Sequence, residues 1–335
     1  MKTASPRYDG LRLEQFNGEH TDDVAELRLA IDRRIDELLA GTGPHDQLTK
    51  AMRASALSAG KRMRPLLLML VARDLGCTSK ALVDVACSVE LVHAASLILD
   101  DLPCMDDASL RRGKPAIHIQ FGEDVAILAS VALLSRAFGV LSQAQDIAPA
   151  TRARLVATLA QTVGDQGLVR GQFEDLHGGA RSPEAIATTN ELKTGLLLGV
   201  AVDMASIICH ADEEVAQQLR AFALAAGQAF QIKDDFLDGK DSAFTGKDTG
   251  KDVGKATLIN TLGRDEAQRR LAACLLEADR CLGAAVGAKG STRHFVTQLF
   301  MKEAKAKRFA PELAKAREAR QNAQVAAQLA ELRLN

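Results

Sequence analysis

Residues 81–107 read ALVDVACSVELVHAASLILDDLPCMDD, a long apolar stretch that ends in aspartates. The apolar part has helical length and few polar residues, which predicts a helix over 81–101 that is buried on most sides. Four carboxylates follow within eight residues: Asp100, Asp101, Asp106 and Asp107. Clustered carboxylates beside apolar surface repel each other and lose hydration unless a cation compensates them. The stretch therefore predicts a buried helix with a cation site at its end.

The arrangement of these carboxylates depends on whether the helix continues. Asp100 and Asp107 are seven positions apart, so a continuous helix would place them on one face. Pro103 would disturb that helix and re-aim the later pair of aspartates. A charged helix end followed by a loop, without a ligand, is the alternative interpretation of this motif alone.

The rest of the chain has the same helical character. An apolar stripe at helical spacing begins after Asp22 and consists of Val24, Leu27, Ile31, Ile35 and Leu38. Helical patterns also predict helices over 47–59, 65–75, 123–143, 150–176, 184–208, 212–239, 265–286 and 312–333. No alternating strand pattern, repeat or linker is evident. We expect one all-α domain over 21–335, preceded by a polar segment, 1–20, that is disordered or loosely attached.

Composition narrows the function classes. The formal net charge of −1 argues against a general nucleic-acid binder. Aromatic residues make up 4% of the chain and Trp is absent, so the core must consist mainly of Leu, Ala, Val and Ile. No apolar segment follows the N-terminus, and no window approaches the ~18 uncharged apolar residues of a membrane span. We expect a soluble, cytoplasmic protein with no membrane span.

A second acidic cluster lies more than a hundred residues after the first. It reads Asp234-Asp235-Phe236-Leu237-Asp238 and follows the apolar stretch 221–232. Asp234 and Asp238 are four positions apart and would share a helix face. Alone, this cluster could equally be a solvated face. Two such clusters facing each other across a helical cavity could hold hard divalent ions, and magnesium suits such oxygen ligands when phosphate is present.

Basic residues are interleaved with the two acidic clusters. They occur in Gly60-Lys61-Arg62-Met63-Arg64-Pro65, Arg111-Arg112-Gly113-Lys114-Pro115, Lys193-Thr194-Gly195, and at Lys247, Lys251 and Lys255. Arginine forks match phosphate oxygens in pairs. Each basic group alone would be interpreted as solvated surface. Their order around the acidic clusters predicts sites for phosphate groups.

As a set, these motifs resemble those of the trans-isoprenyl diphosphate synthases. The motifs quoted above, together with Gly171-Gln172-Phe173-Glu174-Asp175-Leu176 and the segment 227–238, fall in the order of that family and cover roughly residues 22 to 265. The first acidic motif is most similar to bacterial geranylgeranyl diphosphate synthases of carotenoid-type pathways. The resemblance implies a helical barrel of the isoprenoid synthase type around a central cavity, and a homodimer. The last 70 residues carry no motif that matches.

The resemblance also implies roles for individual residues. Three magnesium ions in the closed complex would be held by Asp100, Asp101, Asp106, Asp234 and Asp238. The allylic diphosphate would be neutralised by Arg111, Lys193 and Lys247, with Lys255 at a second basic position. Isopentenyl diphosphate would be held by Lys61, Arg64, His93 and Arg112. Thr194 and Gln231, with Lys193, would lie near the reacting carbons, and Asp107, Asp175 and Asp235 would support the ligands. By itself, His93 would be interpreted as a packed helix histidine.

The function implied is head-to-tail condensation of isopentenyl diphosphate with dimethylallyl, geranyl or farnesyl diphosphate. Metals and basic residues would stabilise the leaving diphosphate, and an apolar cavity would keep water from the carbocation. The alternatives are a farnesyl diphosphate synthase, a class I terpene cyclase and a non-catalytic partner subunit. A cyclase needs no second diphosphate site, and partner subunits usually lack one acidic motif.

Product length is predicted from the helix before Asp100. An isoprene unit adds roughly 5 Å, close to the helical pitch of 5.4 Å, so each unit should meet a new layer of residues. The first layer is Ala95 and Ser96, both small, and the next is Leu91 and Val92, both larger. In the family that the chain resembles, an aromatic at the position of Ala95 is associated with fifteen-carbon products. We therefore expect geranylgeranyl diphosphate, with twenty carbons.

Overall fold

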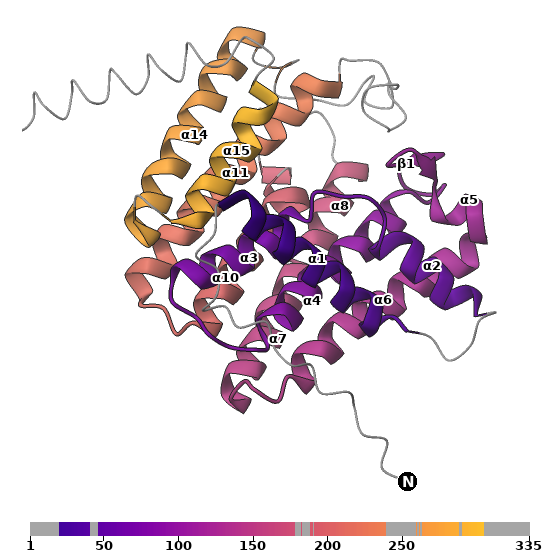
Figure 1. Ribbon diagram of the computed structural model, residues 1–335. Coiled ribbons are helices and arrows are strands. Elements are labelled where there is room, and N and C mark those ends of the chain that lie inside the picture. Colours follow the sequence, from indigo (N-terminus) through magenta and orange to yellow (C-terminus); the bar gives the residue numbers. More distant parts are fainter. Residues whose placement is uncertain are drawn as a thin grey trace, which may run out of the picture.

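The computed structural model describes residues 20–40, 46–177, 182, 188–189, 191–238, 259, 261, 263–287 and 290–304. Within these ranges the chain is almost entirely helical (Figure 1), which confirms the predicted all-α class. The longer helices are α1 (His20–Leu38), α2 (Gln47–Ala56), α3 (Met63–Asp74), α4 (Leu82–Asp100), α6 (Glu123–Gln143), α7 (Pro149–Val163), α8 (Leu168–His177), α10 (Leu196–Ile208), α11 (Glu213–Asp238), α14 (Arg264–Val286) and α15 (Ser291–Ala304). The shorter elements are β1 (Leu110–Arg111), β2 (Lys114–Pro115), α5 (Ile117–Phe121) and the π-helical turn η2 (Glu191–Gly195). The segment 1–19 and the predicted helix 312–333 lie outside the described residues.

Two apolar helices, α3 and α4, form the centre of the molecule. Every residue of Pro65–Ala72 in α3 is buried, and α4 packs against α1, α2, α3, α6 and α10 (Figure 1). A helix that is apolar all round is expected to be enclosed by others. The main apolar core runs from α1 to α15, and a smaller cluster joins α11 to α14. The predicted buried helix over 81–101 is confirmed.

One predicted helix is in fact two. The stretch predicted as a helix over 150–176 is divided into α7 and α8 at Gly164–Gly167. A side chain on Gly167 would collide with the carbonyl of Thr162, so glycine permits this close turn of the backbone. The helix α15 was not predicted, whereas the predicted helix over 123–143 coincides with α6.

The motif after the first acidic cluster forms a small hairpin that the sequence did not predict as strand. In it Leu110 pairs with Pro115 and Arg111 pairs with Lys114. The two residues of the turn, Arg112 and Gly113, have positive φ angles of 54° and 74°. Two positive φ angles in a two-residue loop are typical of a type I′ turn. The hairpin fixes the backbone direction at the two arginines.

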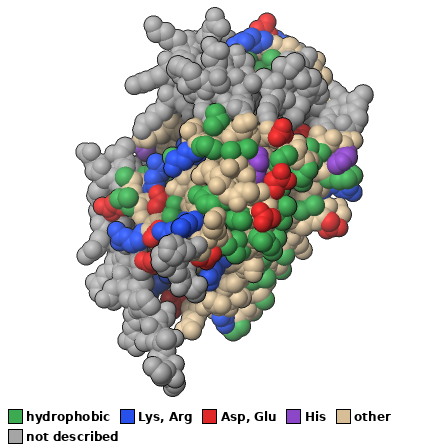
Figure 2. Space-filling view, turned by 90° about the vertical axis from the view of Figure 1, so that its right-hand side faces the viewer, with side chains coloured by type: hydrophobic (Ala, Val, Ile, Leu, Met, Phe, Trp, Pro, Cys, Tyr) green, Lys and Arg blue, Asp and Glu red, His purple; other side chains and the backbone are tan. Residues whose placement is uncertain are grey.

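Contrary to the expectation from sequence, α4 and α6 are long and apolar enough to cross a membrane by length and composition alone. Core helices of soluble proteins pass the same test, and 67% of the α4 window is buried within the molecule. For α6 the share is 39%, because Ile127, Leu128 and Val131 are exposed. Figure 2 shows the side of the molecule where α5 lies, with hydrophobic side chains across the middle of its described surface. Among the described residues, an apolar face on α6 is therefore left without a partner.

Candidate functional site

The first acidic motif lies at the C-terminal end of α4, which ends at Asp100. The chain then turns back, because the Asp106 N–H donates to the Asp100 carbonyl at 2.9 Å and the Asp107 N–H donates to the Leu102 carbonyl at 3.0 Å. Asp106 is thus brought beside the helix end, whereas Asp107 is exposed and has a φ of 47°. The helix therefore does not continue through Asp107. The predicted re-aiming of the later pair after Pro103 is confirmed.

Asp101 is buried and holds Arg111. The Nε atom of Arg111 donates to the two carboxylate oxygens of Asp101 at 2.9 and 3.1 Å, and its Nη2 atom also contacts Oδ1. Burial raises the pKa of Asp101 although Arg111 opposes this shift. Burial alone would lower the pKa of Arg111, but the bonds to Asp101 and the charges of Asp100 and Asp106 raise it. Arg111 therefore lies among three carboxylates of the motif, and magnesium binding by Asp101 stays a prediction.

Arg112, the next residue of the hairpin, points to the segment between α2 and α3. Its Nη1 atom donates to the Ser58 hydroxyl at 2.8 Å. A Cβ atom on Gly60 would lie 2.7 Å from the same nitrogen, so the glycine leaves room for the guanidinium. Burial lowers the pKa of Arg112, and repulsion from Arg62 and Arg111 adds to this effect.

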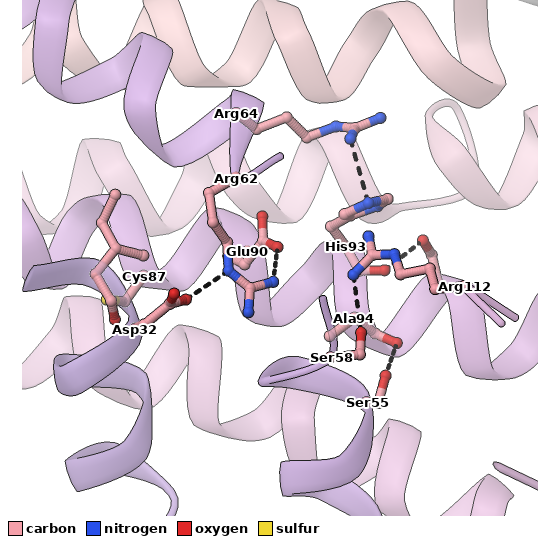
Figure 3. A network of polar contacts seen from close by, with 12 residues as sticks. Asp32, Ser55, Ser58, Arg62, Arg64, Cys87, Glu90, His93, Ala94 and Arg112 are labelled. Atoms are coloured by element: carbon pink, nitrogen blue, oxygen red, sulfur yellow. Dashed lines mark hydrogen bonds and ion pairs between the residues drawn. The ribbon is translucent and has the colours of Figure 1, made fainter. Parts of the chain in front are cut away.

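Arg64 and His93 lie beside Arg112 in one cluster of polar side chains, which we call the arginine pocket (Figure 3). The Nη1 atom of Arg64 lies 3.3 Å from Nε2 of His93. Arginine can only donate, so Nε2 accepts and the ring carries its proton on Nδ1. Burial lowers the pKa of His93 well below its usual value, with further lowering by Arg64 and Arg112, and the ring is therefore neutral at pH 7. The structure thus brings together three of the four residues predicted to hold isopentenyl diphosphate. The fourth, Lys61, is exposed and lies just before α3.

The neutral state of His93 predicts a pH effect on stability. Histidine in an unfolded chain titrates near pH 6.5, whereas His93 in the folded protein resists protonation. The stability that this difference contributes is present above about pH 6.5 and is lost as the pH falls below it, by at most ~1.4 kcal/mol per pH unit. Urea unfolding at several pH values should therefore show a smaller loss for His93→Gln than for the unchanged protein. Equal losses in both proteins would contradict this assignment.

The second acidic motif lies at the C-terminal end of α11, as predicted. The charge of Asp234 favours the charged form of Arg64, although burial lowers the pKa of Arg64 overall. This interaction places Asp234 near the arginine pocket. Asp235 accepts a hydrogen bond from Nε2 of Gln231 at 3.2 Å, so Gln231 holds a carboxylate of the motif. Proximity of Gln231 to the reacting carbons stays a prediction.

The Lys193-Thr194-Gly195 motif forms the π-helical turn η2 at the start of α10. Such turns are rare and occur often at functional sites. A Cβ atom on Gly227 of α11 would lie 3.1 Å from the Cα atom of Gly195. Two motif glycines therefore let the backbones of η2 and α11 approach closely, near the middle of α11. The close approach places this turn next to the helix that carries the second acidic motif.

Some predicted site residues cannot be placed. Lys247 and Lys255 lie outside the described residues, as do the side chains of Lys193, Thr194 and Asp238. The predicted product-length layers can be placed: Ala95, Leu91 and Val92 are fully buried and Ser96 is partly buried. The hydroxyl of Ser130 in α6 donates to the Ala95 carbonyl at 3.2 Å, so this layer lies where α4 meets α6.

Sequence reasoning missed residues that support the site. Ser58 and Gly60 shape the position of Arg112, and no motif pointed to Ser58. Gln172 of α8 has an enclosed side-chain amide whose nitrogen and oxygen find no hydrogen-bond partner among the described residues. Enclosed polar atoms without partners are uncommon and suggest a ligand or water. Gln172 lies in a motif that was recognised, but only as part of the family resemblance.

The donor set was tested for magnesium. Among the described residues, no three His, Cys, Asp or Glu side chains converge on one point. Magnesium does not require such a cage, since one or two carboxylates with waters and substrate phosphates suffice. The partly exposed Asp100, Asp106 and Asp234, with arginines beside them, fit magnesium that arrives with a phosphate-bearing ligand.

Known proteins share the sequence and the fold of this chain. The polyprenyl synthetase family matches residues 45–284. The chain is 51% identical over 288 residues to the geranylgeranyl diphosphate synthase of Pantoea ananas, covering 84% of this chain and 95% of that protein. It is 46% identical over 278 residues to the corresponding synthase of Pseudescherichia vulneris, covering 82% and 90%. The Helicobacter pylori geranyltransferase, solved with magnesium and isoprenyl diphosphate, is similar with a TM-score of 0.76 and 28% identity, covering 87% of this chain and 99% of that one. The chain belongs to the polyprenyl synthetase family.

Proposed function

We propose that the protein is a magnesium-dependent trans-prenyltransferase that condenses isopentenyl diphosphate with allylic diphosphates and releases geranylgeranyl diphosphate. The observation that carries the proposal is the arginine pocket beside the two acidic motifs. Burial disfavours the charged forms of Arg64 and Arg112, and repulsion from neighbouring arginines adds to this: from Arg112 on Arg64, and from Arg62 and Arg111 on Arg112. A bound anion would relieve that repulsion, and a diphosphate would do so most strongly. The names of the two bacterial relatives support the twenty-carbon product.

Isopentenyl diphosphate is assigned to the pocket of Arg64, His93 and Arg112, with Lys61 at its rim. The guanidiniums offer forked donors to the phosphate oxygens, and Nδ1–H of the neutral His93 offers another. The bond from Arg64 to Nε2 orients this ring. Because the pocket is formed before the ligand arrives, little reorganisation opposes binding.

The allylic diphosphate is assigned to the space between the two acidic motifs. Asp100, Asp101 and Asp106 would hold magnesium on one side of this space. Asp234 and Asp238 would hold it on the other side. When bound, magnesium neutralises the diphosphate and stabilises its charge as the allylic C–O bond breaks. Arg111, Lys193 and Lys247 would stabilise the negative charge of the leaving group, and Lys255 is assigned to a second basic position. The number of ions, three, is part of the proposal.

The chain's own residues must then protect the carbocation. Ala95 and Leu91, fully buried residues from two successive layers of α4, would supply apolar walls that exclude water. Thr194 and Gln231 are assigned near the reacting carbons. The alkene of isopentenyl diphosphate forms the new C–C bond, and the proton lost afterwards passes to the released diphosphate. No dedicated protein base is required for this sequence.

Substitution of Arg112 by lysine tests the assignment of the two diphosphate sites. Lysine keeps the charge but loses the fork and the bond to Ser58. We expect the KM for isopentenyl diphosphate to rise by about tenfold, as for loss of one hydrogen bond to a charged group, with little change in the KM for the allylic substrate. Steady-state kinetics with each substrate varied in turn measures both constants. A rise confined to the allylic KM would reverse the assignment.

A cytoplasmic homodimer is also proposed. The homodimer is supported by the apolar face of α6, where Ile127, Leu128 and Val131 are 45%, 57% and 59% exposed. Ile119 of α5 is also 59% exposed. Contiguous exposed apolar patches mark interfaces more often than free surface. Two copies packed through α6 would cover this face, and light scattering of the purified protein tests it.

Product analysis tests the proposed function. The purified chain, isopentenyl diphosphate, magnesium and each allylic primer in turn should yield geranylgeranyl diphosphate on chromatography. A chelator should abolish the product. Release of farnesyl diphosphate as the main product would replace the proposal by its nearest alternative, and no product from the chain alone would indicate a partner subunit.

A further inference from the structure

Arg62 has no role in the function proposed above, although it lies in the sequence between Lys61 and Arg64, which are both assigned to isopentenyl diphosphate. Its guanidinium is buried, with 3% of the side chain exposed, whereas the neighbouring Lys61 is exposed. Figure 3 shows it between Asp32 and Glu90, with Arg64, His93 and Arg112 lying beyond Glu90. A buried arginine among other arginines requires a specific compensation.

Two carboxylates from two helices provide this compensation. The Nε atom of Arg62 lies 2.6 Å from Oδ1 of Asp32 in α1, and Nη1 lies 2.9 Å from Oε1 of Glu90 in α4. The Glu90 side chain is only 4% exposed, whereas that of Asp32 is 38% exposed. One planar guanidinium therefore joins α1 and α4 to the loop before α3. Lysine would do this less well, because its ammonium is a compact point charge without the rigid planar fork of the guanidinium.

The backbone at Arg62 is also unusual. Its φ of 48° and ψ of 35° lie in the left-handed region, and the residue is the N-cap of α3. For a residue with a long side chain this conformation is strained and persists only when surrounding contacts enforce it. The two carboxylates are the contacts available to enforce it. This conformation sets how the chain enters α3 between Lys61 and Arg64, and so where these two side chains leave the backbone.

Glu90 additionally balances the pocket as a whole. Its charge favours the charged forms of Arg62, Arg64 and Arg112. Glu90 and His93 are three positions apart on α4 and so lie on one face of that helix. Glu90, which supplies the counter-charge, and the His93 ring, which is assigned to the substrate, therefore lie on the same face of α4.

We propose that Arg62, held by Asp32 and Glu90, is a positioning residue that sets the affinity for isopentenyl diphosphate by fixing the entry into α3, where Lys61 precedes the helix and Arg64 lies in its first turn. The inference rests on the proposed assignment of isopentenyl diphosphate to the arginine pocket. Arg62 does not touch the substrate. Its loss therefore weakens binding of one substrate without removing any group that takes part in the reaction.

The test compares Arg62→Lys with a matched control, Arg34→Lys. Arg34 also joins α1 to α4, through Asp84 at 2.6 Å, but lies away from the loop before α3. For Arg62→Lys we expect the KM for isopentenyl diphosphate to rise by about tenfold, the allylic KM to stay within about twofold and kcat to stay within about threefold. Arg34→Lys should leave all three constants within about twofold, since a part-exposed pair contributes little. An equal rise in both variants, or in both KM values of Arg62→Lys, would overturn the proposal.

A milder variant keeps the test valid if Arg62→Lys does not fold, which circular dichroism would reveal. Asp32→Asn removes one partly exposed carboxylate and should raise the isopentenyl KM by about threefold. Combined with Arg62→Lys it should add nothing further, because the two residues act through one contact. Calorimetric binding of isopentenyl diphosphate without an allylic primer should show the same changes in Kd. Arg112→Lys is the positive control: if it leaves this Kd unchanged, the site assignment has failed, whereas a response to Arg112→Lys but not to Arg62→Lys or Asp32→Asn refutes only the positioning role.

Discussion

Replacement of Asp100 or Asp234 by alanine is expected to lower kcat by about 10²–10³-fold or more, since each removes a group that stabilises charge in the transition state. The two residues lie at the ends of different helices, α4 and α11. The charge of Asp100 favours the charged form of Arg111, and the charge of Asp234 favours that of Arg64. These interactions support the proposal that both aspartates belong to one site. Single-turnover and steady-state rates at saturating magnesium measure the effect.

The control for this prediction is Asp146→Ala, which removes an exposed carboxylate between α6 and α7. Its activity should match that of the unchanged protein. The far-ultraviolet circular dichroism of all three variants should remain helical, because neither motif aspartate lies in the apolar core. Near-normal turnover of folded Asp100→Ala or Asp234→Ala would show that the acidic motifs do not hold catalytic magnesium.

The second large effect is expected at Ala95, where tyrosine should shift the product from twenty to fifteen carbons. Ala95 is fully buried one turn before the first acidic motif, at the contact between α4 and α6. A tail that runs from Asp100 along α4 would meet a tyrosine ring at this layer before it reached Leu91. Overpacking a core position typically costs ~1–3 kcal/mol, which lowers stability without touching the diphosphate sites. Chromatography of the dephosphorylated products measures chain length.

Ala95→Ser serves as the matched control because it adds one atom and should leave the twenty-carbon product in place. Thermal unfolding of both variants separates loss of stability from a change in product. Unchanged chain length in a folded, active Ala95→Tyr would show that the tail does not follow α4.

The sequence predicted the helices well because apolar periodicity and length are properties of local sequence. The boundaries of α4 and α6 lie within one residue of those predicted, since their apolar runs end in polar or turn-forming residues. The break between α7 and α8 was missed because it depends on a close backbone approach at Gly167, which no periodicity reveals. The hairpin at Arg112 was missed because its strands are only two residues long.

The candidate site was predicted as a set of motifs, but not as a network. Arg64, His93 and Arg112 were expected together, and the structure places them together. The pairing of Asp101 with Arg111, of Gln231 with Asp235 and of Arg62 with Glu90 could not be predicted. These contacts join residues whose distance in space depends on helix packing and on the direction of the hairpin. The extent of the single domain, 21–335, stays a prediction.

The most direct test of the central claim is the stoichiometry of diphosphate release with farnesyl diphosphate as the allylic substrate. Two diphosphates are assigned to one chain, so ionisation should be coupled to condensation. With isopentenyl diphosphate and magnesium present, one diphosphate should be released for each isopentenyl diphosphate consumed, and none should be released when isopentenyl diphosphate is omitted. Release of diphosphate from the allylic substrate alone, with formation of a hydrocarbon or alcohol, would contradict the account and indicate a cyclase.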